Sequence, residues 1–160
     1  MSPPHPPFAV QAGEGSVLET PTGDRAVVKA DAAQTNGSMT VIELVIGPKQ
    51  GPALHEHRND DELWFVLDGE FRFKVGEVML QASIGGMAYG PRGTPHCFQN
   101  VGDEPGRLLI VTTPAGLERF FRDFAAGSPA GPAAPETLAE LGLAHGLEFR
   151  GPPLGVSDPI

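Results

Sequence analysis

Two histidines separated by one residue, His55 and His57, have a spacing that favours metal binding. On an extended strand, residues i and i+2 point to the same face, so the two imidazoles would lie side by side. The chain then passes through a polar segment, residues 58–61, which is suited to a loop, before Glu62 opens a further strand. A carboxylate at that point can approach the same position in space as the two imidazoles.

A third imidazole, that of His96, follows a Pro- and Gly-containing loop over residues 91–95. Three neutral imidazoles and one carboxylate suit Fe(II), Mn(II), Ni(II), Co(II), Cu(II) or Zn(II). An ion that accepts five or six ligands would keep room for water, O2 or substrate, as a catalytic site requires. Taken singly, each of these residues could equally be an ordinary surface or core residue. Their joint spacing is what predicts a site for one divalent transition metal.

The remaining histidines and the single cysteine are interpreted differently. His5 lies in a Pro-rich stretch and His145 at the end of a predicted helix, so we expect both at the surface and exclude them as ligands. Cys97 follows His96 directly and would face away from the metal on a strand. We interpret it as a small buried residue, because no basic residue lies close by in the sequence to lower its pKa.

The elements that would position these side chains are short strands. Strand-like segments, rich in apolar residues and bounded by Gly, Pro, Asn or Asp, recur from Ser16 to about Val111. They cover residues 26–30, 39–46, 63–67, 71–75, 78–82, 87–89, 96–100 and 108–112. Several short strands at this spacing predict an all-β sandwich or barrel.

One turn carries a specific signal. Asp68 and Gly69 separate two of these strands, and Asp-Gly favours a two-residue hairpin turn. We therefore predict that residues 63–67 and 71–75 pair as a hairpin. Alternation along residues 71–75 predicts one apolar face and one face in contact with water.

After residue 113 the pattern changes to helix. Leu117, Phe120, Phe121 and Phe124 have the spacing of one helical face, and Gly127 can end the helix. A Pro/Ala/Gly linker follows over residues 128–135, and a second short helix is predicted over residues 136–145. We interpret the apolar face of the first helix as core packing against the strands.

Composition limits the possible partners. The chain has 160 residues, a formal net charge of −9 and a pI of about 4.9, so it would repel phosphate backbones, and we expect no nucleic acid or membrane partner. No apolar run approaches the ~20 residues of a transmembrane helix. The first residues lack a basic start and an apolar core, so we expect no signal peptide. One cysteine cannot form an internal disulfide, and a cytoplasmic location is the expectation.

The two histidine-containing segments resemble the paired motifs of the cupin superfamily. In the first motif Lys49 stands where the family has a leading glycine, and the remaining positions match at His55, His57, Glu62 and Gly69. The second motif matches at every position: Gly85, Pro91, Gly93, His96 and Asn100. The resemblance implies a cupin (double-stranded β-helix or jelly-roll) barrel with one or two C-terminal helices. It also implies that His55, His57, Glu62 and His96 are the metal ligands.

The wider sequence is similar to small bacterial monocupins described as quercetinase-like, over roughly residues 10–125. The Pro/Gly-rich start, the strand signals and the later helical pattern divide the chain into an N-terminal extended arm (residues 1–15), a cupin barrel (residues 16–113) and a helical, Pro/Gly-rich C-terminal extension (residues 114–160). Because cupins are often dimers, the resemblance implies a homodimer. The resemblance alone also implies that Glu62, beside the metal, is the catalytic base toward a flavonol hydroxyl.

Apolar residues near the ligands predict a pocket. Because side chains alternate between the two faces of a strand, Trp64 and Val66 would point to the same side as Glu62. Phe98 would likewise point to the same side as His96. We expect these residues, together with Met87 and Tyr89, to line an apolar pocket, the alternative being ordinary barrel filling. Such a pocket beside a metal suits a hydrophobic or aromatic small-molecule substrate.

Three functions stay open at this stage. The first is a metal-dependent, quercetinase-like dioxygenase acting on a phenolic or enolisable aromatic compound. The second is a non-oxidative cyclase or isomerase with a polyketide-like or sugar-like substrate, in which zinc acts as a Lewis acid. The third is a cupin that binds a small molecule without turnover.

Overall fold

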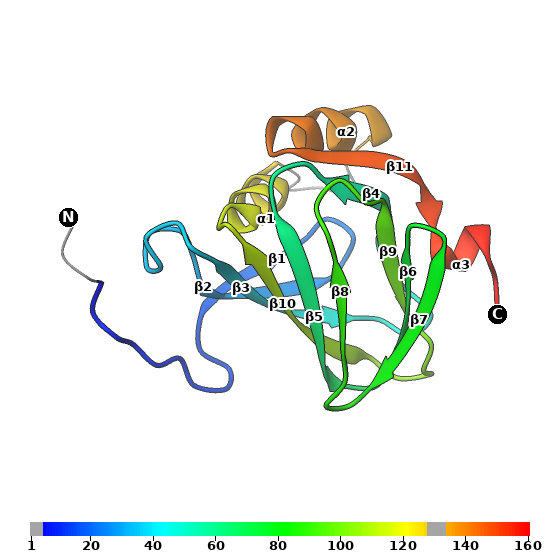
Figure 1. Ribbon diagram of the computed structural model, residues 1–160, viewed down its shortest axis with the longest axis horizontal. Helices are drawn as coiled ribbons and strands as arrows, with labels where there is room; N and C mark the ends of the chain where they lie inside the picture. Colours follow the sequence, from blue (N-terminus) through cyan, green and yellow to red (C-terminus); the bar gives the residue numbers. More distant parts are fainter. Residues whose placement is uncertain (1–4, 128–133) are drawn as a thin grey trace.

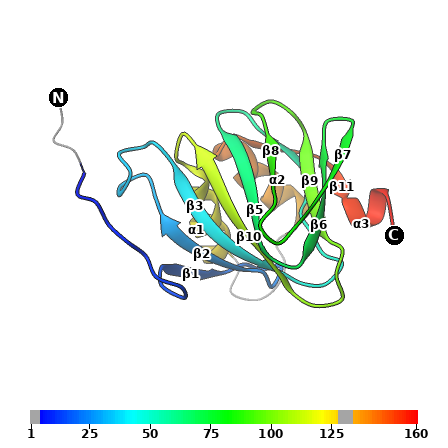
Figure 2. The ribbon, with the colours of Figure 1, turned by 60° about the horizontal axis from the view of Figure 1, so that its bottom comes forward.

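Two antiparallel β-sheets face each other and enclose the core of the protein, as a computed structural model shows (Figure 1, Figure 2). The structure describes residues 5–127 and 134–160. The first sheet has the strand order β1-β2-β3-β10-β5-β8, and the second has the order β11-β4-β9-β6-β7. All pairings within both sheets are antiparallel.

The strands of the first sheet are β1 (Ser16–Glu19), β2 (Arg25–Ala30), β3 (Thr40–Ile46), β5 (Asp61–Asp68), β8 (Met87–Gly90) and β10 (Gly106–Thr113). Those of the second sheet are β4 (Ala53–His57), β6 (Glu70–Val75), β7 (Val78–Ser83), β9 (His96–Asn100) and β11 (Leu147–Pro153). The helices are α1 (Leu117–Ala126), α2 (Pro135–Ala144) and α3 (Leu154–Ser157). The all-β prediction is confirmed, and each of the eight predicted segments overlaps one of these strands.

Alternating burial shows how the sheets form one core. Along β3, buried residues alternate with partly buried ones, so every second side chain points between the sheets. The inner faces meet in a group of aromatic rings, in which Trp64 of the first sheet packs 5.5 Å from Phe73 of the second, measured between ring centroids. This core holds the strands that carry the candidate ligands at fixed positions.

The predicted hairpin at Asp68-Gly69 is wrong. Strand β5 pairs with β10 and β8 in the first sheet, whereas β6 pairs with β7 and β9 in the second. Gly69 has a positive φ of 84°, which glycine adopts readily, and the chain uses it to pass from one sheet to the other. The Asp-Gly signal correctly marks a sharp change of direction, but it does not determine which strands pair.

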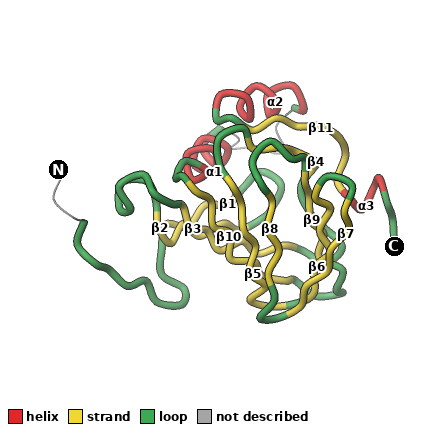
Figure 3. Tube along the Cα trace, in the orientation of Figure 1, coloured by secondary structure: helices red, strands yellow, loops and turns green. Residues whose placement is uncertain are grey.

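The C-terminal extension contributes to the barrel as well as covering it. Helices α1 and α2 begin and end within a residue of the predicted positions and lie at one end of the sheets (Figure 3). Beyond α2, strand β11 pairs with β4, so a segment for which no strand was predicted completes the edge of the second sheet. The predicted linker lies outside the described residues except for 134 and 135.

The outer face of β6 is less exposed to solvent than predicted. Arg72 is 5% exposed, and its guanidinium donates hydrogen bonds to the Gln99 side chain and to Asp158, which follows α3. The C-terminal segment therefore covers this face of the second sheet. In the part of the chain that the structure describes, no helix has the length and apolar character needed to cross a membrane.

Candidate metal centre

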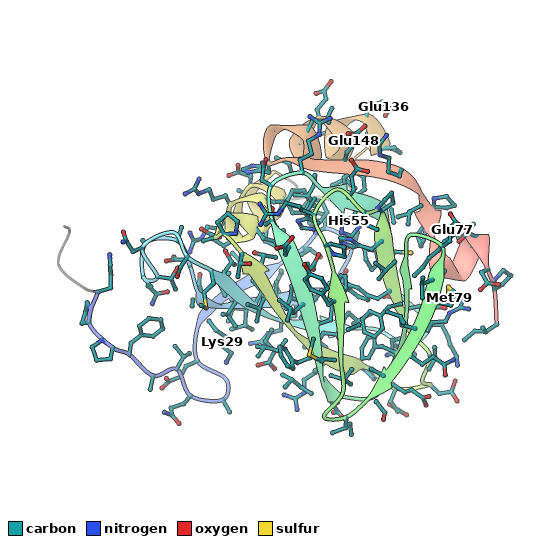
Figure 4. The ribbon with its side chains drawn as sticks, in the orientation of Figure 1. Lys29, His55, Glu77, Met79, Glu136 and Glu148 are labelled. Carbon is teal, nitrogen blue, oxygen red and sulfur yellow. The ribbon has the colours of Figure 1, made fainter. Side chains whose placement is uncertain are left out.

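Four side chains from three strands converge inside the barrel. His55 and His57 come from β4, Glu62 from β5 and His96 from β9. Their candidate ligand atoms all lie within 4.8 Å of one another, and each side chain is at most 8% exposed. Figure 4 shows His55 inside the barrel, at the end covered by β4 and β11. The structure thus brings together the four residues that the spacing singled out.

The arrangement follows from the local course of the chain. Alternation along β4 directs both histidines inward and leaves Glu56 on the outer face, where it pairs with Arg150. In the neighbouring strand His96 lies directly opposite His55 in register. The short connection after β4 crosses to the first sheet, so Glu62 approaches the three imidazoles from the facing sheet.

Hydrogen bonds behind the rings determine which nitrogen is free. Nδ1 of His55 lies 2.7 Å from the carbonyl oxygen of Ala53, and Nδ1 of His96 lies 3.0 Å from that of Thr94. Nδ1 of His57 lies 2.7 Å from a carboxylate oxygen of Asp60. Because these oxygens can only accept, each Nδ1 carries the proton and donates, and in the neutral ring Nε2 has a lone pair for a metal.

Glu62 completes the donor set. One of its carboxylate oxygens lies 3.0 Å from Nε2 of His57 and 3.0 Å from Nε2 of His96. Three imidazole nitrogens and a carboxylate oxygen that face one point are a donor set for a divalent transition metal. This buried cluster could bind a metal ion.

The electrostatics of the four groups are unequal. Burial, together with the neighbouring imidazoles, lowers the pKa of His55 to about 3. Burial also opposes charge on His57, but the Glu62 carboxylate and the hydrogen bond with Asp60 outweigh it and raise the pKa of His57 to about 10. Burial opposes charge on Glu62 as well, yet the adjacent His57 and His96 hold the Glu62 pKa well below its usual value. Glu62 is therefore a carboxylate.

A glycine makes room for the cluster. Gly90 of β8 lies opposite Glu62 in register. A Cβ atom at this position would lie 2.5 Å from Cη2 of Trp64 and 3.2 Å from Nδ1 of His96. Any larger residue would push against the indole or the imidazole, so the absence of a side chain at Gly90 is part of the site.

An apolar cavity of about 90 Å³ opens on the cluster. Its walls are formed mostly by Phe, Leu, Ile and Pro side chains, and His55, His57 and Glu62 are exposed to it. Its apolar lining residues are Leu44, Pro52, Phe98, Ile110, Leu117, Phe120, Phe121, Leu147 and Phe149. We call this space the inner cavity.

The expected pocket residues have different positions in the structure. Phe98 lines the inner cavity, whereas Trp64 and Val66 are buried in the barrel, with the Trp64 ring edge-on to His96 at a centroid distance of 5.0 Å. Met87 and Tyr89 are each 47% exposed and point away from the core, because Ala88 and Gly90 occupy the inward positions of β8. The expectation for Met87 and Tyr89 is therefore corrected: these two side chains lie on the outside of the barrel.

Several residues of the site were not anticipated. Asp60 was assigned to a polar loop, although its place three residues after His57 is a usable signal for an orienting carboxylate. Phe149 lies 6.1 Å from His55 between ring centroids, and it comes from β11, which was not expected to be a strand. Phe120 and Phe121 of α1 were interpreted as core packing, and they also form the cavity wall.

Comparison with known proteins agrees with this geometry. Residues 42–112 match a family model described as "Cupin domain". This segment of the chain is similar to the cupin family. The two-sheet architecture is accordingly a cupin jelly-roll, and all four candidate ligands lie inside the matched region.

Several proteins of known structure share this fold. The chain is similar to KdgF from a Halomonas species (14% identical, TM-score 0.60, covering 68% of this chain and 94% of that one). It is also similar to a cupin-superfamily sugar phosphate isomerase from Silicibacter pomeroyi (19%, TM-score 0.59, 68% and 77%) and to an RmlC-like cupin from Shewanella frigidimarina (17%, TM-score 0.59, 71% and 96%). At these identities the similarity shows the fold alone.

One curated relative has a comparable sequence. An uncharacterized protein of Methanocaldococcus jannaschii is 24% identical over 75 residues, which are 47% of this chain. The match spans 60% of the relative's length.

Proposed function

We propose that this protein is a metal-dependent enzyme that acts on a hydrophobic or aromatic small molecule carrying an ionisable oxygen. The observation that carries the proposal is the inner cavity, where an apolar, partly aromatic wall adjoins the cluster of three imidazoles and a carboxylate. A polar substrate would gain little from such walls, whereas a phenol or enol would place its apolar body against them and its oxygen near the cluster.

The chain's own residues would prepare the site for this chemistry. Ala53, Thr94 and Asp60 hold the three imidazoles in one orientation through their Nδ1 hydrogen bonds. Glu62, a carboxylate at the edge of the cavity, is the group that could accept the substrate's proton. A bound divalent metal would supply a positive charge for an ionised substrate oxygen and, if redox-active, a site for O2 chemistry.

Within this class we favour a quercetinase-like dioxygenase, on the strength of the sequence resemblance. The alternative is a non-oxidative cyclase or isomerase with zinc as a Lewis acid. The apolar wall favours a polyketide-like substrate over a sugar-like one in that case, because the described residues lining the inner cavity include no lysine or arginine to bind a phosphate. A binding protein without turnover is the third possibility.

Oxygen consumption distinguishes these functions. Metal-free protein would be loaded in parallel with Fe(II), Mn(II), Co(II), Ni(II), Cu(II) or Zn(II) and mixed with a flavonol, with and without O2. We expect O2 uptake that accompanies loss of the flavonol absorbance with at least one redox-active metal, and none for Glu62→Gln carrying the same metal. Substrate conversion without O2, best with zinc, would support the second function. Binding with no conversion under any metal would contradict an enzymatic role.

A further inference from the structure

A second, larger cavity of about 740 Å³ lies beside the inner one. Its walls come from the barrel on one side and, on the other, from helices α1, α2 and α3 with the residues that follow. Among the residues that line it, but not the inner cavity, are Ile46, Phe124, Leu138, Val156 and Ile160. We call this space the outer cavity.

The two cavities share a wall. Six residues line both of them: Leu44, Pro52, Phe98, Phe120, Phe121 and Phe149. The outer cavity therefore adjoins the inner cavity, which opens on the candidate metal ligands, across a shared apolar wall in which α1 supplies two of the six side chains. A molecule that touches these shared residues from the outer side is one side-chain thickness from the inner cavity.

Size separates the roles of the two cavities. Pockets that hold a small molecule usually measure about 300–1,000 Å³. The inner cavity, at about 90 Å³, is far below this range, and the outer cavity, at about 740 Å³, lies within it. The inner cavity can accept the reacting end of a molecule, but not a body of the size that the outer cavity can hold.

The outer cavity also has a polar end. Thr20, Thr22 and Asp24, at the turn between β1 and β2, line it together, with Thr22 donating a 2.9 Å hydrogen bond to Asp24. Burial raises the Asp24 pKa. Lys49, Gln50 and Gln99 line it as well, and most of the remaining lining residues are apolar, so the cavity combines an apolar surface with hydrogen-bonding groups.

We infer that the outer cavity is a binding site for an extended apolar chain or ring system attached to the reacting group of the substrate. This inference rests on the proposed function for the reacting end and adds the substrate class: a long, amphipathic phenol or enol rather than a single-ring compound. The C-terminal extension, which supplies 10 of the 22 lining residues, thereby becomes a determinant of specificity.

A series of 4-alkylcatechols tests the inference, because the ring is constant and only the tail grows. Affinity would be measured by titration on the zinc-loaded protein, which separates binding from turnover. Burial of each methylene contributes about 0.8 kcal/mol, so we expect the affinity to rise by up to about fourfold per methylene from ethyl to octyl. A series with no dependence on tail length would overturn the inference.

Two variants locate the tail. Val156→Trp and Leu138→Trp each place a large ring in the wall of the outer cavity, and Val156 is 70% exposed, so the fold should tolerate the change there. Val78→Trp on β7 is the matched control at an exposed valine outside the cavity. We expect both cavity variants to bind octylcatechol at least tenfold more weakly than Val78→Trp does. Their affinity for catechol and their zinc content should equal those of Val78→Trp. Equal octylcatechol affinity in all three variants would contradict the inference.

The same proteins separate this inference from the proposed function. Binding of the apolar dye Nile red to metal-free protein should be weakened by Val156→Trp and not by Val78→Trp, whether or not any catechol is converted. Conversion of a phenol with no effect of the cavity variants would leave the enzyme proposal intact and overturn the outer site. Tail-dependent binding with no conversion would support the outer site and contradict the enzyme proposal.

Discussion

At the scale of single residues, Asp60 is the orienting group that a side-chain change can remove, because the other two imidazoles are held by backbone carbonyls. Its carboxylate fixes the tautomer of His57 and makes the ring a better donor. We expect Asp60→Ala to weaken metal binding by about 10–100-fold. Competition with a chelating dye measures this affinity.

The control for that prediction is the neighbouring carboxylate. Asp61 faces the surface and forms an ion pair with Arg92 at 3.0 Å. Asp61→Ala should bind metal as the wild type does. If both variants lose affinity equally, the effect comes from the loop as a whole and not from the hydrogen bond to His57.

The pKa of His57 leads to a second residue-scale prediction. Because this pKa is raised to about 10, His57 carries a proton in the metal-free protein throughout the neutral range, whereas His55, with a pKa of about 3, does not. A metal binds the neutral ring, so loading should release about one proton from His57, and affinity should rise about tenfold per pH unit below pH 10.

Calorimetry of metal binding in buffers of different ionisation enthalpy counts the released protons. The measured enthalpy should vary with the buffer in proportion to about one proton near pH 8. An enthalpy that does not depend on the buffer would contradict the charged His57–Glu62 pair.

At the scale of elements, a buried contact holds α1 over the barrel. Thr40 of β3 donates to the buried carboxylate of Glu118 on α1 and accepts a 3.0 Å hydrogen bond from the backbone of Gly116. Thr112 of β10 lies opposite Thr40 in register, and it too is buried, but its hydroxyl has no hydrogen-bond partner among the described residues. The two threonines form a matched pair.

The same substitution should have opposite effects at these positions. Thr40→Val leaves the Glu118 carboxylate without that donor and should lower the free energy of unfolding by about 1–3 kcal/mol. Thr112→Val removes a buried hydroxyl that has no partner and should raise it by about 1 kcal/mol. Urea unfolding measures both, and a destabilised Thr112→Val would show that its hydroxyl is paired after all.

The elements also show what the sequence could and could not predict. Strands and helices were predictable because alternation and helical spacing are local. The clustering of the four candidate ligands was predictable because their motif fixes both their spacing and the face of the strand on which each lies. Strand pairing was not, since the turn at Gly69 has the same local chemistry in a hairpin and in a crossing between sheets. Strand β11 was missed because its prolines, Pro152 and Pro153, resemble a loop. Proline is tolerated there because β11 is an edge strand.

At the scale of the whole molecule, the outward side chains of β5 and β8 suggest where a second copy would bind. Phe65 lies opposite Met87 and Leu63 lies opposite Tyr89 in register, so these side chains lie together on the outer face of the sheet, where Phe65, Met87 and Tyr89 are exposed. Strand β8 is also a sheet edge. Exposed apolar patches of this kind often mark interfaces.

The homodimer expected from the family resemblance therefore remains a prediction with a defined surface. Light scattering should give a dimer for the wild type and a monomer for Met87→Glu/Tyr89→Glu, because burying two carboxylates would oppose association. Leu143→Glu, at an exposed leucine of α2, is the control and should stay dimeric. A monomeric wild type, or a dimer that survives the double substitution, would contradict this interface.

The central claim is that His55, His57, Glu62 and His96 hold one metal ion, and elemental analysis of the protein purified without a histidine tag tests it most directly. We predict one equivalent of a divalent transition metal in the wild type, directly or after reconstitution, and a loss of at least tenfold in His96→Ala, with His145→Ala as the control that retains it. A wild type that binds no metal under any condition, or a His96→Ala variant that keeps its full equivalent, would contradict the account.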